Sequence, residues 1–107
     1  MPIEDQLPMT ESAFYILLSL LTPRHGYGII QHVETITAHR IVLGAGTVYG
    51  TLKKFQKAQL IDLVDQTTDR KVYQVTETGR QLLLAERNRL NELITNAEVL
   101  DHGTQTD

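Results

Sequence analysis

The sequence predicts a mainly α-helical protein with a small β-hairpin. Two observations carry this prediction. Apolar residues recur at helical spacing across residues 11–58 and again after residue 76, and two short runs rich in β-branched residues lie between them, at 61–66 and 71–75. With 107 residues, the chain is long enough for one small domain and marginal for two.

Composition excludes several classes of protein. The chain has no cysteine, which excludes disulfides and thiolate metal sites. No apolar run approaches the roughly 20 residues that span a bilayer, and the acidic N-terminus lacks the basic start of a secretory signal. These features favour a cytoplasmic protein without membrane contact. Because the net charge is −3, any binding to nucleic acid requires local clustering of basic residues.

The first predicted helix covers residues 11–21. Thr10 can cap it, and Glu11 suits its positive N-terminus. Two adjacent stripes make most of its circumference apolar: Phe14, Leu17, Leu18 and Leu21 form one, and Ala13, Ile16 and Leu20 form the other. Such a helix must be covered on two sides, and in so small a domain we expect a second chain to supply one cover.

A second helix is predicted over residues 27–38, after a break that Pro23 and Gly26 mark. Its inward side chains are expected to be Ile29, Ile30, Val33 and Ile36. Residues 40–46 then form a connection that contains two glycines.

The third helix is predicted over residues 47–58, and its two faces differ sharply. Val48, Leu52 and Phe55 form one apolar stripe. The other side is cationic with little bulk at its centre; it carries Thr47, Gly50, Lys54 and Lys57, with Lys53 at its edge. Since a glycine within a helix costs about 1 kcal/mol, Gly50 indicates close approach of a ligand such as a phosphate chain. The alternative is a solvated face whose glycine packs against a neighbouring helix.

The two β-rich runs predict a hairpin, with residues 67–70 as the turn and Arg70 and Lys71 at its tip. Three helices followed by a hairpin is the order of a winged helix-turn-helix domain, which we assign to residues 9–75. In that architecture the third helix enters the major groove of DNA. Residues 1–8 and 101–107 are expected to be flexible termini.

A long fourth helix, capped by Thr76 and running to about residue 99, is predicted to be a dimerisation helix within residues 76–100. Its apolar stripe consists of Leu83, Leu90, Ile94 and Ala97, flanked by Leu82, Leu93 and Leu100. About 24 residues make a rod of about 36 Å, too long for one small domain to cover. An uncovered stripe would exceed the apolar patch that monomers usually tolerate, so we expect a homodimer. The alternative is a helix that folds back on its own domain.

Four runs of sequence carry a family resemblance: TESAFYILLSLL, HGYGIIQHVE, GAGTVYGTLKKFQKAQLI and RKVYQVTETGRQLL. Together they cover about residues 9–90, and they resemble the PadR family of bacterial winged-helix regulators. The resemblance implies a homodimer that binds a pseudo-palindromic operator in double-stranded DNA, usually as a repressor. The single C-terminal helix resembles the short-tailed branch. That branch dimerises through its fourth and first helices, and some members release DNA on binding a small hydrophobic or aromatic effector.

Carried over residue by residue, the resemblance implies DNA contacts from Tyr49, Lys53 and Lys54 on the third helix and from Arg70 and Lys71 on the wing. We add Thr47, Gly50 and Lys57 from the exposed side of that helix. An effector cavity or dimer interface is expected between the first and fourth helices, lined by Phe14, Leu17, Leu18, Leu83, Leu90, Leu93, Ile94 and Ala97.

Three positions depart from the family pattern. Val48 stands where leucine is usual, which is a mild change. Gln59 stands where the family usually has a glycine, which would end the third helix in a left-handed turn. Gln59 must therefore strain that turn or end the helix differently. Ala38 likewise replaces a usual glycine at the end of the second helix.

Catalysis has little support in the sequence, so we expect no enzyme, no cofactor and no metal. His25, His32 and His39 are spaced by seven residues, which is about 10.5 Å along a helix and too far to share one metal with bonds of about 2.1 Å. A second hypothesis for the function is a winged-helix module that binds another protein, with its lysines merely solvated. Positive charge on both the third helix and the wing tip favours DNA, because a protein-binding module has no reason to carry both.

Overall fold

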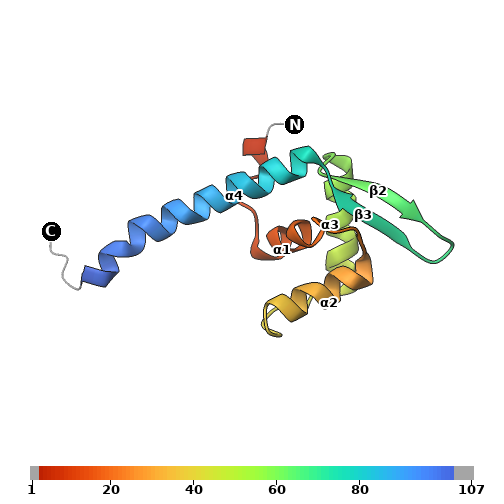
Figure 1. Ribbon diagram of the computed structural model, residues 1–107, viewed down its shortest axis with the longest axis horizontal. Coiled ribbons are helices and arrows are strands. Elements are labelled where there is room, and N and C mark those ends of the chain that lie inside the picture. The colour runs from red at the N-terminus through yellow and green to blue at the C-terminus, as the bar shows by residue number, and fades with distance from the viewer. Residues whose placement is uncertain (1–2, 103–107) are drawn as a thin grey trace.

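The computed structural model describes residues 3–102, and within them the chain forms four α-helices and one three-stranded antiparallel sheet (Figure 1). In chain order the elements are the 3-10 helix η1 (Ile3–Gln6), α1 (Glu11–Ser19), β1 (Arg24–His25), α2 (Gly26–Ile36), α3 (Ala45–Lys57), β2 (Ile61–Gln66), β3 (Lys71–Val75), α4 (Glu77–Asn96) and the 3-10 helix η2 (Ala97–His102).

The core lies where α1, α2, α3 and the first half of α4 meet the sheet. The predicted stripe of α3 faces inward, because Val48, Leu52 and Phe55 are all buried. The other buried hydrophobic side chains are Ile16, Leu17, Leu20, Ile29, Val33, Leu43, Leu60, Ile61, Tyr73, Leu82 and Leu83. Burial of these large side chains is the main favourable term that holds the elements together.

Helix α1 begins as predicted but ends earlier. The Thr10 side chain accepts a hydrogen bond from the Ala13 N–H at 3.1 Å, which makes it the N-cap. The helix stops at Ser19 rather than at residue 21. The carbonyl of Leu20 instead accepts a hydrogen bond from the Val75 N–H at 2.9 Å, so the chain here is tied to the sheet and leaves the helix.

Helix α2 also ends two residues before the predicted boundary, at Ile36. The prediction that Ile36 faces inward is wrong, since its side chain is 46% exposed. Ala38 and His39 have φ angles of 52° and 66°, in the left-handed region that a helix cannot continue through. Ile29 and Val33 are buried, as predicted.

The hairpin has the predicted strands β2 and β3, but the sheet contains a third strand that the sequence did not indicate. The strand order is β1-β3-β2, and Arg24 of β1 lies opposite Tyr73 of β3. Strand β1 has two residues, which is too short to show the alternation that identifies a strand. It attaches the hairpin to the start of α2.

The beginning of the chain is more ordered than predicted. Residues 1–8 were expected to be a flexible terminus, yet η1 forms at Ile3–Gln6, and Ile3 and Leu7 pack against the core. The Met9 N–H donates a hydrogen bond to Glu86 on α4 at 3.3 Å. The expectation is therefore wrong for residues 3–8. It is also wrong for residues 101–102, which belong to η2, while residues 1–2 and 103–107 lie outside the described part of the chain.

Helix α4 belongs to the globular body over its first half and projects from it over the second (Figure 1). Thr76 caps it by accepting a hydrogen bond from the Gly79 N–H at 3.1 Å, and Leu82 and Leu83 are buried in the core. The projecting part gives a shape of 62 × 32 × 20 Å. Since the core continues into α4, residue 76 starts a helix but does not separate two packed units. The predicted fold class, a mainly α winged helix with a long C-terminal helix, is confirmed.

Candidate nucleic-acid interface

The outward face of α3 is open and nearly flat at its centre. A Cβ atom added at Gly46 or Gly50 would meet no atom of the described residues within 4 Å outside the helix's own backbone. With 3.6 residues per turn, these glycines and Lys57 point almost directly away from the buried stripe, and Lys53 lies beside them. All four residues are exposed. The centre of this face therefore combines an accessible helix backbone with two positive charges.

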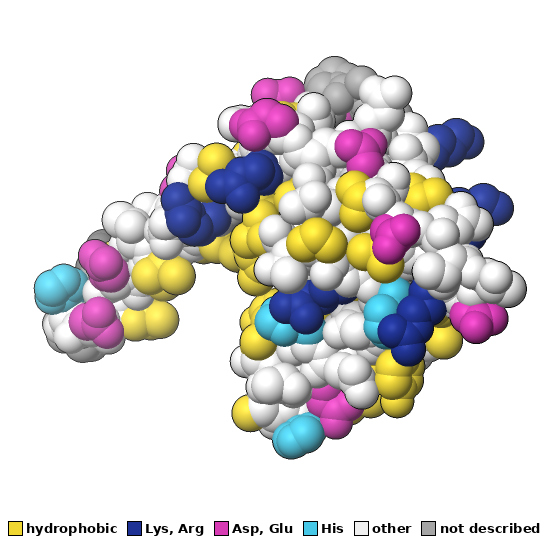
Figure 2. Space-filling view, turned by 45° about the vertical axis from the view of Figure 1, so that its right-hand side comes forward, with side chains coloured by type: hydrophobic (Ala, Val, Ile, Leu, Met, Phe, Trp, Pro, Cys, Tyr) yellow, Lys and Arg dark blue, Asp and Glu magenta, His cyan; other side chains and the backbone are white. Residues whose placement is uncertain are grey.

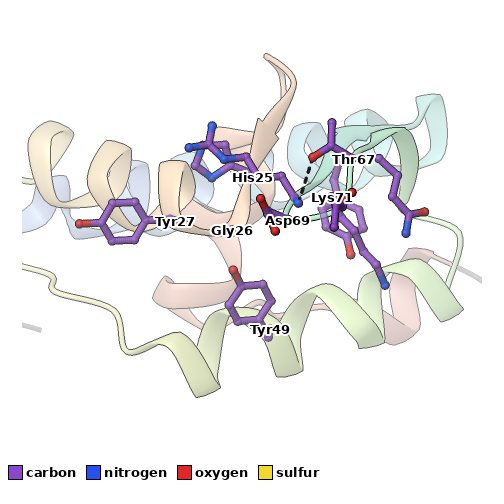
Figure 3. Close-up of a pocket in the computed structure, with 11 residues that line it drawn as sticks. His25, Gly26, Tyr27, Tyr49, Thr67, Asp69 and Lys71 are labelled. Carbon is purple, nitrogen blue, oxygen red and sulfur yellow. Dashed lines mark hydrogen bonds between the residues drawn. The ribbon is translucent and has the colours of Figure 1, made fainter.

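Lys54 and Tyr49 mark the two sides of this face. Lys54 lines a groove of about 250 Å³ together with Pro8, Met9 and Thr51, on the side of the N-terminal segment. Tyr49 lies on the other side, toward α2 and the wing (Figure 3). The sequence analysis placed Lys54 on this face and Lys53 at its edge. At 100° per residue the two lysines lie at similar angles on either side of the centre of the face, and both are exposed. Thr47 is exposed as well, on the same side as Lys54.

The wing extends from the body in the opposite direction to α4 (Figure 1). Its turn is closed by a hydrogen bond from the Thr67 N–H to the Arg70 carbonyl at 2.8 Å and by one from the Arg70 N–H to the Thr67 Oγ1 at 3.2 Å. Arg70 and Lys71 are exposed at its tip. Arg70 and Lys71 are the only basic residues of the hairpin, residues 61–75, so its positive charge is confined to the tip. Asp69 lies beside them, and β2 carries two further carboxylates, Asp62 and Asp65.

A half-open groove of about 560 Å³ separates the wing from α3 and from the start of α2 (Figure 3). Tyr49 borders it on α3, and the turn residues 66–70 border it on the wing. Tyr73 also lines it; burial raises the pKa of Tyr73, and the neighbouring Tyr49 raises it further. The His25 ring accepts a hydrogen bond from the Gly28 N–H at 3.2 Å and so caps α2 beside the groove. This groove was not predicted, because β1 and the capping role of His25 were not recognised from the sequence.

The apolar residues assigned to a dimer or effector interface divide into two groups. Phe14, Leu18 and Leu83 line a groove of about 170 Å³ between α1 and α4, which Arg80 and Arg87 flank. Leu17 is not part of it, because its side chain is fully buried in the core of its own chain. The assignment of Leu17 to an interface is therefore wrong. Leu83, which is 6% exposed, contributes mainly to the core and forms only part of the groove wall.

The second group lies on the projecting part of α4. Leu93 and Ile94 are 52% and 63% exposed, Ala97 is exposed and Leu90 is half-buried. At 100° per residue these four side chains share one side of the helix. Figure 2 shows hydrophobic side chains on this projecting part and where it leaves the body. This row of apolar side chains, residues 90, 93, 94 and 97, is called the arm stripe below.

Two histidines have local structural roles. His25 caps α2, and the Nδ1 atom of His39 lies 2.7 Å from the Glu34 carboxylate. Burial lowers the pKa of His32, and the charge of Arg24 lowers it further. Within residues 3–102, no group of three or more histidine or acidic side chains is arranged to hold a metal ion. The helices of that part of the chain include none with the length and apolar character needed to cross a membrane.

Comparison with known proteins identifies relatives of this chain. Residues 16–85 match the Transcriptional regulator PadR-like family. The fold is similar to a PadR family transcriptional regulator from Eggerthella lenta, with a TM-score of 0.70 and 20% identity over 95% of this chain and 87% of that one. It is also similar to a PadR-like regulator from Bacillus cereus, with a TM-score of 0.70 and 20% identity over 87% and 93% of the two chains.

A curated relative matches by sequence. Over 86 residues the chain is 31% identical to an uncharacterized 37.1 kDa protein in transposon TN4556 of Streptomyces fradiae. The aligned region covers 78% of this chain and 24% of that protein. The chain thus spans about a quarter of the length of this relative. The family match, in contrast, extends over more than half of this chain and includes α3 and the wing. On that evidence the chain belongs to the PadR-like family, whose members are transcriptional regulators and not enzymes.

Proposed function

We propose that this protein is a cytoplasmic, homodimeric repressor that binds double-stranded operator DNA. The observation that carries the proposal is the exposed face of α3. A helix that enters the major groove must let bases and phosphates approach its backbone, and Gly46 and Gly50 leave that space open on the face that also carries Lys53 and Lys57. A solvated helix surface has no need of two glycines there, since each lowers helix propensity by about 1 kcal/mol.

The proposed DNA contacts follow the position of each side chain. Thr47, Tyr49, Gly50 and Lys53 lie on α3 where base edges would be met, while the other basic residues suit phosphates; these are Lys54, Lys57, Arg70 and Lys71. The wing tip lies across the groove from Tyr49, so one DNA strand could be bordered by α3 on one side and by the wing on the other. The carboxylate of Asp69 beside the tip limits how deeply a phosphate can enter.

The arm stripe supports the proposal of a homodimer. Of the four apolar side chains of the arm stripe, Leu93, Ile94 and Ala97 are exposed in the single chain and Leu90 is half-buried. Pairing with a second copy would bury them, and it would hold two α3 helices for the two halves of a pseudo-palindromic operator, about 34 Å apart.

The groove between α1 and α4 supports a proposed effector site. It is lined by Phe14, Leu18 and Leu83, and dimerisation through α4 would bring further apolar side chains toward it. A flat hydrophobic molecule bound there could release DNA only if it favoured a dimer with wrongly spaced α3 helices. Titration of planar aromatic compounds, with thermal stability and operator affinity followed together, tests this. Compounds that stabilise the dimer and leave operator affinity unchanged would contradict the coupling.

The DNA-binding proposal is tested by fluorescence anisotropy with DNA from upstream of the protein's own gene. Specific binding is expected, with an affinity that falls as salt rises. Lys57→Gln should reduce the slope of log affinity against log salt by about one unit per subunit, because one phosphate contact is lost. Arg87→Gln on α4 is the matched control and should leave the slope unchanged.

Gly50→Leu tests directly whether the exposed face of α3 must approach DNA closely. A Cβ atom at position 50 would meet no described neighbour within 4 Å and the residue is exposed, so circular dichroism should show an intact fold. Specific binding should nevertheless disappear, because the bulk holds the helix away from the groove. Normal DNA binding by this variant, or no binding of any DNA by the wild type, would contradict the proposal and favour a protein-binding module.

A further inference from the structure

The Tyr49 ring lies directly against Gly26, the first residue of α2. A Cβ atom built at Gly26 would be 2.6 Å from both Cζ and Oη of Tyr49 and 2.7 Å from its Cε1. No carbon can approach an aromatic ring so closely, so the ring occupies the space that any other residue at position 26 would fill. Figure 3 shows the Tyr49 side chain rising from α3 toward Gly26.

We infer that Gly26 is a positioning residue that sets where Tyr49 contacts DNA and thereby contributes to operator specificity. The inference rests on the proposed DNA-binding function. It goes beyond the sequence prediction, in which Gly26 only marked the break before the second helix.

The exposure of Tyr49 explains why such support is needed. Its side chain is 52% exposed, although it stands on a helix proposed to enter a DNA groove. An exposed tyrosine samples several rotamers, and fixing one of them on binding costs free energy. Contact with Gly26 holds the ring toward the groove that separates α3 from the wing, so the phenol is already placed at the border of the proposed DNA surface.

Position 26 acts on Tyr49 rather than on the fold, because the obstructing atoms are the far end of a flexible side chain. An alanine methyl group at position 26 can be accommodated if the tyrosine ring swings away. The backbone also accepts alanine, because Gly26 is the first residue of α2 and its own φ angle does not lie in the left-handed region. Alanine at position 26 should therefore displace the phenol and leave the core intact.

Gly28 provides a matched control on the same helix. A Cβ atom there would lie 3.6 Å from the nearest atom of the His25 ring, which is ordinary van der Waals contact. Gly28→Ala therefore makes the same chemical change two residues away without displacing an aromatic ring. If helix propensity or flexibility of α2 mattered for binding, both alanine variants would have the same effect.

The experiment is a double-mutant cycle on operator DNA and on scrambled DNA of equal length. Gly26→Ala and Tyr49→Ala should each lower operator affinity about tenfold, the size of one lost specific contact, and change affinity for scrambled DNA much less. The double variant should be no weaker than Tyr49→Ala alone, because displacement of an absent ring has no effect. Gly28→Ala should bind like the wild type.

Three outcomes would overturn the inference: additive losses in the double variant, an equal loss for Gly28→Ala, or an equal loss on operator and scrambled DNA. A measurement without DNA separates this inference from the proposed function. In NMR spectra of the free protein, Gly26→Ala should shift the Tyr49 ring signals and leave the methyl signals of core residues such as Ile16 and Leu82 in place. Unchanged Tyr49 signals would disprove the positioning itself. A wild type that bound no DNA would instead remove the proposed function, and with it the role in specificity.

Discussion

The backbone N–H of Met9 donates a hydrogen bond to Oε1 of Glu86 at 3.3 Å, which joins residues 77 positions apart in the chain. Arg89 donates two more, from Nε to Oε1 at 3.0 Å and from its terminal nitrogen to Oε2 at 2.6 Å. Glu86 is only 2% exposed, so its charge is stabilised by these partners rather than by water. The carboxylate thus fastens the start of the chain to α4, near the point where that helix leaves the body.

Replacement of Glu86 by glutamine should destabilise the protein. The amide removes the charge that Arg89 pairs with and lacks one acceptor, so we expect a loss of about 1–3 kcal/mol in the free energy of unfolding. Urea denaturation followed by circular dichroism measures it. Glu92→Gln, at an exposed carboxylate in the interior of the same helix, is the control and should change stability by less than about 0.5 kcal/mol.

The same carboxylate should make stability depend on pH. Hydrogen bonds from Arg89 are the main cause that lowers the pKa of Glu86; burial opposes them, and the Met9 N–H adds to them. A lowered pKa contributes stability above the unfolded value of about 4.3 and loses it as pH falls through the folded value. The stability difference between wild type and Glu86→Gln should therefore shrink as the pH is lowered below about 4. A difference that stayed constant there would show that the charge is not responsible.

Gly79→Ala should be strongly destabilising. At Gly26 the atoms that obstruct a Cβ belong to a side chain that can move, whereas at Gly79 they include the backbone. A Cβ atom at Gly79 would overlap the carbonyl oxygen of Leu60 and lie 2.5 Å from Cγ2 of Val75. Backbone cannot swing aside as a tyrosine ring can, so the start of α4 must move, at a cost of about 1–3 kcal/mol. Thermal unfolding measures the effect. Gly46→Ala, where the methyl group enters open space, is the matched control and should be neutral or slightly stabilising.

Helical periodicity predicted the core side of α3 and the existence of all four helices, because a local pattern reports which side of a helix is buried. The end of α3 illustrates where this information stops. Gln59 adopts φ 61°, and the Leu60 N–H bonds to the Phe55 carbonyl at 2.9 Å while the Gln59 N–H bonds to that of Gln56 at 3.1 Å. This is the Schellman arrangement. Glutamine thus accepts the left-handed turn, one of the two outcomes that the sequence left open.

The features that the sequence did not predict depend on contacts between distant parts of the chain. Strand β1 exists because Arg24 meets Tyr73, and a two-residue strand carries no pattern of its own. Leu17 is buried because its own domain covers that side of α1. From the sequence alone, a helix that is apolar over most of its circumference could equally be covered by a partner chain. For the candidate site, the exposed face of α3 was predictable from helical periodicity, but the contact of Tyr49 with Gly26 joins two helices and required the three-dimensional structure.

At the wing, replacement of Arg70 and Lys71 together by alanine should weaken binding to all DNA sequences and keep the preferred operator sequence. Both side chains are exposed at the tip of a hairpin, so the fold should persist. Loss of phosphate contacts lowers affinity without removing base contacts. Selection of binding sites from random DNA measures the preference. A changed core sequence in the selected sites would mean that the wing reads bases, contrary to the proposed division of roles.

The arm stripe offers the sharpest test of assembly. Removal of the chain from residue 81 onward would be a poor test, because it also removes Leu82 and Leu83 from the core. Leu93→Glu combined with Ile94→Glu changes only two exposed side chains of the arm stripe, so each chain should stay folded. We expect monomers in sedimentation analysis, since two acidic residues per chain would be buried unpaired in the interface.

Operator affinity should fall steeply in the same variant, because the two half-sites would no longer be bound as a unit. Thr95→Glu is the matched control: this residue is also exposed, but at 100° per residue it lies on the opposite side of α4 from the arm stripe. It should remain dimeric and keep its operator affinity. A double variant that stayed dimeric would exclude the arm stripe as the dimer interface, and a monomer that bound the operator as tightly as the wild type would show that dimerisation is not needed for DNA binding.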